Sequence, residues 1–436
     1  MASLKRNVKK NGKVVYRIDI FLGVDKAGKR VAKVITYEVN QNDSVRQQER
    51  EAQRYSMEVE EKLKKGIYFD SDKMSLEEFA EKWLANKKTT LNYSTFETYA
   101  RIVNQKILPY FRVSKLNRIQ TPQVEEFYHT LLDDHSNATI RKIANVLNGM
   151  FKTAVRWGML QINPCQAAIV PRDSEEETSL KFYTPEQSLM FLRSLDLTFR
   201  TEVKGHRRID DTGKPYLVED YLLPRKLPLQ LKVFYYLSLY CGFRKSETLA
   251  LCWNDIDFEN KTINISKSVG KSEEGAVIKR PKTSTSIRTV SLPKNIMPLL
   301  VSYKWEYDLY KANLGTAWQG EDNLFIQEDG KRMDRSTPYQ SFKRHLGRYN
   351  EWVQNDPMAK EQGFEDLPDI PLHGLRHSCA TLLNYLEVNI ASISKVLGHA
   401  KVSTTMDIYA HAFDEQSREA ADKLDHFLRN NNQRAI

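Results

Sequence analysis

The segment PLHGLRHSCATLLNYLEVNIASISKVLGHAKVSTTMDIYAHAF, residues 371–413, carries His373, Arg376, His399 and Tyr409 between two helical patterns. His373 and Arg376 are three residues apart, so a helix that begins just after His373 places both side chains on one face. We therefore expect this segment to hold the chemistry of the chain and the remaining segments to support it.

Two other interpretations of the segment stay open on its residues alone. In the first, HGLRHSCATLL is an amphipathic helix that buries Leu375, Cys379 and its later leucines, and its polar residues are merely solvated. In the second, His373 and His377 stand at the spacing of two zinc ligands on one helix. The zinc hydrolase pattern places glutamate directly after the first histidine, whereas Gly374 stands there in this chain.

Length and charge indicate a multidomain protein that faces a polyanion. A chain of 436 residues is long enough for two or three domains. Its net charge is +10, and residues 1–33 alone contribute +8. A basic block of this density favours nucleic acid as the partner.

Membrane and secreted classes fit less well. The longest apolar run, residues 233–243, is too short to span a bilayer, and no apolar segment follows the basic N-terminus as in a signal peptide. The four cysteines are scattered without a CxxC pair, which favours reduced thiols and predicts neither a disulfide framework nor a zinc site. We expect no membrane partner and a bacterial cytoplasmic, nucleoid-associated location.

Residues 1–66 predict a small basic β-sheet followed by a helix. Residues 14–22 and 31–39 have the composition of strands around a turn at 25–28, in a hairpin or a three-stranded sheet, and residues 43–65 have helical periodicity. A sheet of this kind can enter a major groove, although a solubilised edge sheet would have the same composition. The candidate DNA-binding residues are Lys5, Arg6, Lys9, Lys10, Lys13, Arg17, Lys29, Arg30 and Lys33.

Residues 75–165 predict a helical domain. Ser75 with Glu78 and Ser94 with Glu97 have capping-box spacing, and Thr121 precedes a proline as an N-cap would. The prolines and acidic cluster of residues 166–181 indicate a linker. The four expected helices cover residues 75–86, 94–108, 122–133 and 137–157.

Residues 182–436 predict a mainly helical domain with a small antiparallel sheet, so the fold class expected for the whole chain is α+β and multidomain. One apolar helix covers residues 229–251 and contains Arg244, with Glu247 one turn later to hold its guanidinium. Residues 200–228 are an insertion of uncertain fold, and Lys282 lies at the tip of a hairpin over residues 276–292. The remaining expected elements are two short strands within 255–266, a strand at 323–327 and helices at 293–313 and 335–353.

Arg244, Lys282, His373, Arg376, His399 and Tyr409 together fit phosphoryl transfer. Two arginines and two histidines match the non-bridging oxygens of a pentavalent phosphorane, so no metal or other cofactor is required. Tyr409 supplies a nucleophile that needs a cationic setting, and Lys282 can protonate a leaving alkoxide.

The motifs GFRKSE (242–247), PKTSTSIR (281–288), HGLRH (373–377), LGH (397–399) and DIYAH (407–411) resemble, in order and spacing, those of tyrosine recombinases of the phage and conjugative-transposon integrase type. The resemblance implies that the five cationic or imidazole residues hold the scissile phosphate while Tyr409 attacks it to form a 3′-phosphotyrosyl enzyme. Glu247 would support Arg244. The products would be an integrated or excised mobile element, such as a prophage in viral genome integration.

The resemblance also implies an arm-binding domain over residues 1–66, a SAM-like core-binding domain over 75–165 and a catalytic domain with a tail helix over 182–436. Its partners would be double-stranded DNA at core and arm sites, three further copies in a homotetramer, an excision factor and a host DNA-bending protein.

Three alternatives accompany this expectation. A catalytically silent DNA-binding regulator would share the fold, but the complete set of six residues argues against it. A relaxing topoisomerase would share the chemistry, but two separate DNA-binding modules argue against it. A metal-dependent hydrolase would rest on His373 and His377.

Overall fold

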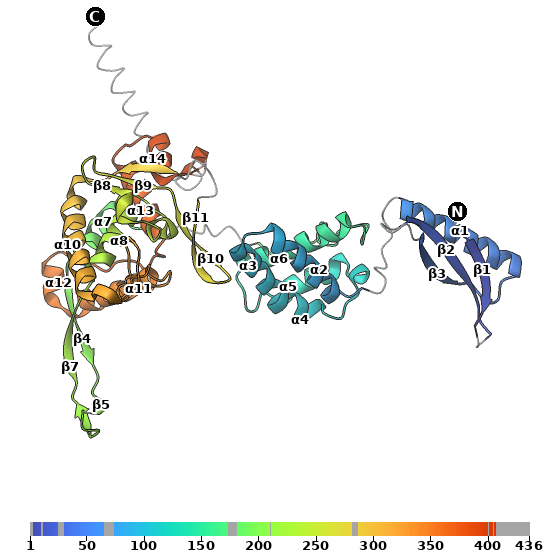
Figure 1. The fold of residues 1–436 in the computed structure, drawn as a ribbon, viewed down its shortest axis with the longest axis horizontal. Coiled ribbons are helices and arrows are strands. Elements are labelled where there is room, and N and C mark those ends of the chain that lie inside the picture. The colour runs from blue at the N-terminus through green and yellow to red at the C-terminus, as the bar shows by residue number, and fades with distance from the viewer. Residues whose placement is uncertain are drawn as a thin grey trace, which may run out of the picture. The chain divides into compact units, whose positions relative to one another are not determined.

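The protein is described from a computed structural model. The structure describes residues 3–9, 12–24, 30–64, 74–172, 181–209, 211–280, 287–399, 401–403 and 405–406. The chain divides into two compact units, Met1–Glu176 and Glu177–Ile436. It is mainly helical, with small antiparallel sheets and an N-terminal sheet (Figure 1).

The N-terminal sheet is a three-stranded antiparallel meander in the order β1-β2-β3, with one helix packed on it. Tyr16, Ile18 and Ile20 are buried on the face that meets Ala52 and Val59 of the helix. The alternation of residues along the middle strand therefore decides which face is covered. The elements are β1 (Ser3–Val8), β2 (Val14–Val24), β3 (Arg30–Glu38) and α1 (Val45–Lys64).

The helices of residues 74–172 pack around one apolar core that includes Phe79, Trp83, Phe127 and Phe151. The predicted Ser75–Glu78 capping box is present. The predicted box at Ser94 was wrong, because Asn92 caps that helix instead. The elements are α2 (Leu76–Thr90), α3 (Tyr93–Ile102), the π-helical turn η1 (Val103–Ile107), α4 (Leu108–Phe111), the 3₁₀ turn η2 (Leu116–Arg118), α5 (Thr121–Thr130) and α6 (Asn137–Arg156).

The second unit surrounds the apolar helix α8 (Leu229–Tyr240), whose Phe234, Tyr235 and Leu237 are fully buried. The helix predicted over residues 229–251 was wrong in its second half. The chain leaves helical geometry at Gly242, which has a φ of +60°, and restarts at α9 (Lys245–Thr248). The other helices are α7 (Pro185–Ser194), α10 (Met297–Leu314), α11 (Thr337–Asn355), α12 (Pro357–Glu361), α13 (Gly374–Tyr385) and α14 (Ile390–Leu397).

The sheet of this unit has the order β12-β9-β8, and a separate hairpin pairs β10 with β11. The hairpin predicted over residues 276–292 was therefore wrong: β11 pairs back with β10, and β12 joins β9, because each strand finds its partner outside that segment. Residues 323–327 form isolated bridges instead of the predicted strand. The strands are β8 (Ile256–Asp257), β9 (Thr262–Ile265), β10 (Ser268–Ser272), β11 (Gly275–Lys279) and β12 (Arg288–Ser291), with 3₁₀ turns η3 (Trp253–Asp255), η5 (Lys294–Ile296) and η6 (Gly315–Ala317).

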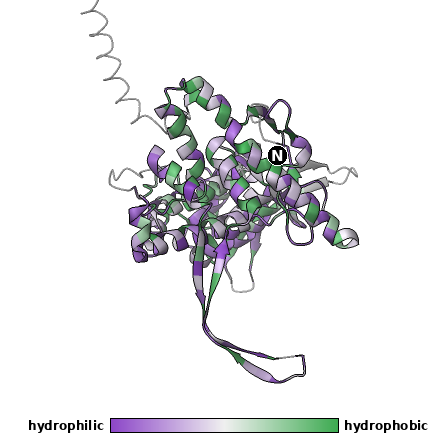
Figure 2. Cartoon of the chain, turned by 90° about the vertical axis from the view of Figure 1, so that its left-hand side faces the viewer, coloured by the Kyte–Doolittle hydropathy of each residue, from purple (hydrophilic) through white to green (hydrophobic). Residues whose placement is uncertain are grey.

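The insertion of uncertain fold is a β-ribbon that projects from the helical body (Figure 1). Its base pairs β4 (Thr198–Val203) with β7 (Tyr221–Lys226), and its outer part pairs β5 (His206–Ile209) with β6 (Pro215–Val218). Hydrophobic and hydrophilic residues are interspersed along it (Figure 2). Leu217 on β6 is 69% exposed. None of the helices that the structure describes is long and apolar enough to cross a membrane.

Candidate active site

The corner between α8 and α9 places Arg244 at the centre of the second unit. Gly242 is needed there for two reasons: its φ is +60°, and a Cβ at this position would lie 2.5 Å from Leu397 Cδ2. The close approach brings the end of α14 against the corner. Arg244 itself is the N-cap of α9 and keeps about a third of its side chain exposed.

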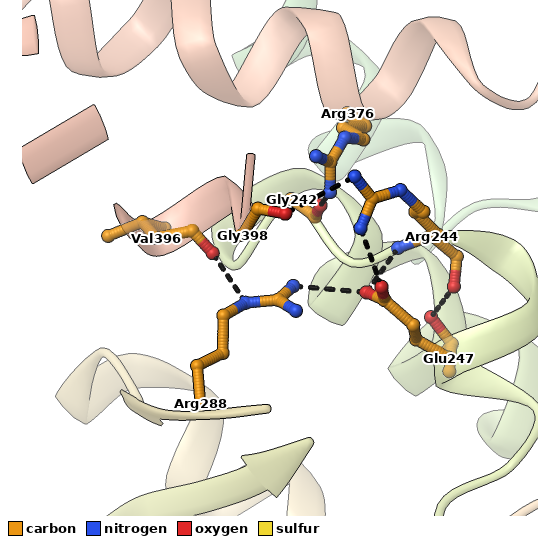
Figure 3. Close-up of polar contacts among 8 residues, drawn as sticks. Gly242, Arg244, Glu247, Arg288, Arg376, Val396 and Gly398 are labelled. Carbon is orange, nitrogen blue, oxygen red and sulfur yellow. Dashed lines mark hydrogen bonds and ion pairs between the residues drawn. The ribbon is translucent and has the colours of Figure 1, made fainter. Parts of the chain in front are cut away.

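Glu247, one turn after Arg244, is a buried carboxylate shared by two arginines (Figure 3). Arg244 Nη1 donates to its Oε1 at 2.7 Å, and Arg288 Nη2 donates to its Oε2 at 3.0 Å. Burial alone would raise the pKa of Glu247, but the charge of Arg288 and the hydrogen bonds from both arginines outweigh burial and lower that pKa. The carboxylate is therefore ionised and fixes the direction of the Arg244 guanidinium.

Arg288 is the buried partner on the other side of Glu247. It stands at the start of β12, and its Nε donates to the carbonyl oxygen of Val396 at 2.9 Å (Figure 3). Its guanidinium also lies over the ring of Phe243, 5.6 Å from the ring centroid. These contacts connect β12, α9 and the end of α14 through one side chain.

Gly398 makes room for this arginine. It ends α14 in the left-handed region with a φ of +66°, and a Cβ there would lie 2.7 Å from Arg288 Nη1. Its carbonyl oxygen also accepts a hydrogen bond from Arg244 Nη2 at 3.4 Å. His399 follows directly, so the same turn positions the next polar side chain.

Arg376 approaches Arg244 from α13 (Figure 3). It is 3% exposed, and its Nη1 donates to the carbonyl oxygen of Gly242 at 2.6 Å. Its buried Nη2 has no hydrogen-bond partner within the described part of the chain. Burial, with the charge of Arg244 added, lowers the pKa of Arg376 to about 9. A buried cation with an unsatisfied donor beside a second cation fits an anion with several oxygens.

Three histidines border the two arginines. The rings of His373 and His377 meet edge to face with centroids 5.1 Å apart, and His399 Nδ1 lies 2.8 Å from Thr405 Oγ1. Loss of hydration, together with neighbouring positive charges that include Arg376, lowers the pKa of His373 and of His399 to about 4. Both imidazoles are therefore neutral at pH 7 and can exchange hydrogen bonds with a bound anion.

Of the six candidate catalytic residues, the structure gathers Arg244, His373, Arg376 and His399 around one place. Lys282 and Tyr409 lie outside the described residues. Arg288 is the residue that sequence reasoning missed as a participant. It closes the PKTSTSIR motif, which was the available signal, but its two partners lie 41 and 108 residues away along the chain.

The candidate DNA-binding residues of the N-terminal sheet are only partly described. Lys10 and Lys29 fall outside the described residues. Lys5 and Arg17 are cross-strand neighbours, and exposed ion pairs join Lys9 to Glu38 and Arg17 to Asp19. Exposed pairs of this kind are weak, so both cations stay available to a polyanion.

The alternative zinc site requires a third ligand beside His373 and His377. No group of three or more His, Cys, Asp or Glu side chains lies close enough to hold a metal ion within those parts of the chain. His373 and His377 contact each other through their rings, without a described third ligand.

The chain is similar to known proteins in sequence and in fold. Residues 217–416 match the model of the phage integrase family, and residues 75–132 match that of the phage integrase N-terminal SAM-like domain. A XerC-like tyrosine recombinase of Caldanaerobacter subterraneus is 25% identical over 96% of this chain and 98% of its own length. The ICEBs1 integrase of Bacillus subtilis is 28% identical over 97% of this chain and 100% of its own.

A similar solved structure is that of the Tn1549 transposon integrase in complex with a circular intermediate DNA. It has a TM-score of 0.60 and 19% identity, and the match covers 80% of this chain and 99% of that one. This likeness concerns the fold.

Proposed function

The chain is a tyrosine recombinase of the phage and conjugative-transposon integrase type, and from that premise we propose that Arg244, Lys282, His373, Arg376 and His399 hold a DNA phosphate for attack by Tyr409. As a site-specific recombinase, it cuts and rejoins DNA strands of mobile elements. The observation that carries the residue assignment is the buried Nη2 of Arg376, which lies beside Arg244 without a hydrogen-bond partner among the residues that the structure describes.

The reaction is two successive transesterifications. The Tyr409 hydroxyl gives its proton to a neutral imidazole, that of His373 or His399, and its oxygen bonds to phosphorus while the bond to the 5′ oxygen breaks. Lys282 gives that 5′ oxygen its proton. Arg244 and Arg376 neutralise the non-bridging oxygens, and the neutral imidazoles of His373 and His399 add hydrogen bonds. A 5′-hydroxyl from the partner duplex then displaces the tyrosine. Each phosphodiester bond that breaks is replaced by a new one, so the reaction does not require ATP.

The modules would share the DNA. Residues 1–66 bind arm-type sites, residues 75–165 bind the core site, 166–181 link them to the catalytic residues 182–436, and four copies assemble on paired sites. An excision factor and a host DNA-bending protein complete the reaction. The Tn1549 transposon integrase, solved with DNA, supports a double-stranded DNA partner for this fold.

The test uses a core-site duplex nicked beside the crossover, so that the cleaved fragment diffuses away. Wild type, Tyr409→Phe and the control Tyr385→Phe are incubated with it in chelator. Tyr385 is a tyrosine of the same unit with 66% of its surface exposed. Wild type and Tyr385→Phe should form a covalent adduct on a denaturing gel, and Tyr409→Phe should not.

Three other outcomes oppose the proposal. DNA binding by all three proteins without any adduct would favour the silent regulator. An adduct that disappears with chelator would favour a metal-dependent reaction. An adduct that survives in Tyr409→Phe would assign the nucleophile to another residue.

A further inference from the structure

Helix α10 has apolar residues on two opposite faces. Leu300, Tyr303 and Tyr307 are buried against the unit. Directly opposite, Val301, Trp305 and Leu309 recur every four residues and are 56%, 70% and 48% exposed. A surface helix normally turns polar residues outward, so an outer stripe that includes an exposed tryptophan marks a contact surface.

A cavity of about 690 Å³ lies along one side of α10 and is lined by Glu306, the residue that follows Trp305, but not by the stripe residues themselves. Its volume is in the range of sites that receive a ligand or a group of side chains. Leu231, Ile326, Tyr303 and Tyr307 line it together with the carboxylates Glu306 and Glu328. Glu306 and Tyr310 belong to α10 and line the cavity themselves, which joins it to the stripe.

The polar groups of the cavity offer acceptors. The Tyr310 hydroxyl donates to the carbonyl oxygen of Glu328 at 2.8 Å, and the Tyr307 hydroxyl donates to that of Glu321 at 3.3 Å. Their donors are therefore occupied, and Lys304 Nζ already lies 5.5 Å from the ring centroid of Tyr307, whereas the ring of Tyr310 and the two carboxylates remain. Within the described residues, Glu306 and Glu328 form no ion pair. A cationic side chain fits such a site, because carboxylates and aromatic faces both attract it.

Lysines of α10 already use this chemistry elsewhere on the helix. Lys304 Nζ lies 5.2 Å from the ring centroid of Trp253, and Lys311 Nζ lies 5.4 Å from that of Trp318. The cavity beside Glu306 has the same kind of acceptors. The complementary cation there would come from another molecule.

We propose that the outer stripe of α10 and the adjoining cavity dock a basic amphipathic segment of a partner protein. Its apolar residues would cover Val301, Trp305 and Leu309, and its Lys or Arg side chains would enter the cavity beside Glu306 and Glu328. The helix lies on the flank away from the β10–β11 hairpin (Figure 1). The inference stands apart from the catalytic proposal.

Two other occupants fit these residues less well. DNA phosphates would be repelled by Glu306 and Glu328 and would leave the apolar stripe uncovered. A second copy could pack stripe to stripe about a twofold axis at Trp305, and Glu306 of one copy would then lie near Glu306 of the other. The repulsion between these two carboxylates opposes that contact.

The experiment uses the full chain and a fluorescein-labelled synthetic helix with leucine on one face and lysine on the other. Fluorescence anisotropy measures its Kd for wild type, Trp305→Ser and the double variant Glu306→Lys with Glu328→Lys. We expect saturable binding that weakens about tenfold or more in both variants. The controls are Leu222→Ser, an apolar residue 60% exposed on the ribbon, and Glu219→Lys with Glu259→Lys, and they should bind as wild type does.

Four results would overturn the docking proposal. One is the absence of saturable binding, and another is equal binding of a probe in which glutamate replaces every lysine. Weaker binding of a short DNA duplex by Trp305→Ser than by wild type and Leu222→Ser would assign the surface to DNA. Sedimentation that shows wild type as a dimer and Trp305→Ser as a monomer would assign it to a second copy.

Discussion

Arg288 and Glu247 form a buried ion pair, Nη2 to Oε2 at 3.0 Å, with side chains only 6% and 5% exposed. The pair joins the sheet to the corner that carries Arg244. Because Glu247 also accepts from Arg244, a displacement of Arg288 changes the support of a proposed phosphate ligand. Arg288 is thus a positioning residue whose effect is transmitted through Glu247.

Substitution Arg288→Lys should lower the rate of DNA cleavage by about tenfold, equivalent to about 1.4 kcal/mol in the barrier. An ammonium keeps the charge, but it lacks the planar fork that serves Glu247 and Val396 together. The measurement is single-turnover adduct formation on the nicked duplex, with urea unfolding alongside.

The matched control is Arg332→Lys. Arg332 also donates to backbone carbonyls in this unit, those of Leu249 and Leu251, but it has no contact with Glu247. Its replacement should lower stability without a specific loss of cleavage. Equal cleavage rates in the two variants would show that Arg288 has only a structural role.

Glu247→Gln should remove a pH-dependent part of stability. The folded-state pKa of Glu247 lies below its ordinary value of 4.5, so its ionisation stabilises the fold above that value, and the contribution is lost as pH falls through the lower folded-state pKa. At pH 7 we expect a loss of about 3 to 5 kcal/mol, because Arg244 and Arg288 then lack their buried carboxylate. Urea unfolding measures the free energy of unfolding of wild type and variant at pH 7 and below pH 4.5. The prediction is contradicted if the free energy of unfolding falls with pH in the variant as steeply as it does in wild type.

Gly398→Ala should destabilise the protein and slow cleavage. Alanine at a φ of +66° costs about 1 kcal/mol in backbone strain, and its Cβ would lie 2.7 Å from Arg288 Nη1. Gly363→Ala is the matched control, because Gly363 has a φ of +74° with nothing within 4 Å of the added Cβ. If both variants lose the same stability and retain full cleavage, the contact with Arg288 has no functional role.

Arg376→Met should abolish cleavage while leaving the free protein about as stable as wild type. Burial and the nearby Arg244 charge disfavour the Arg376 cation, so removing that charge offsets the lost hydrogen bond to Gly242. Thermal unfolding with and without core-site DNA measures the Tm of each protein in the free and the DNA-bound state. DNA should raise the Tm of wild type more than that of the variant, and a large destabilisation of the free variant would contradict the prediction.

The sequence by itself determined the local features and the chemical class. Short-range rules located the helix start at Ser75, whose side chain accepts a hydrogen bond from the residue three positions ahead, and two strands of the N-terminal sheet. The ordered motifs around Arg244, His373, Arg376 and His399 indicated the recombinase family. Phosphoryl transfer requires these residue types, and this requirement can be recognised in the sequence without knowing how the rest of the unit packs. The assignment of Lys282 and Tyr409 rests on the motifs alone.

Only the tertiary structure decided contacts between distant segments. It paired β12 with β9 instead of β11, placed Arg288 between Glu247 and Val396, and left Trp305 of α10 70% exposed. Periodicity records which residues share a face of an element, but not which neighbour covers that face. Strand pairing and buried ion pairs depend on which distant segments meet, and that is decided by the packing of the whole unit.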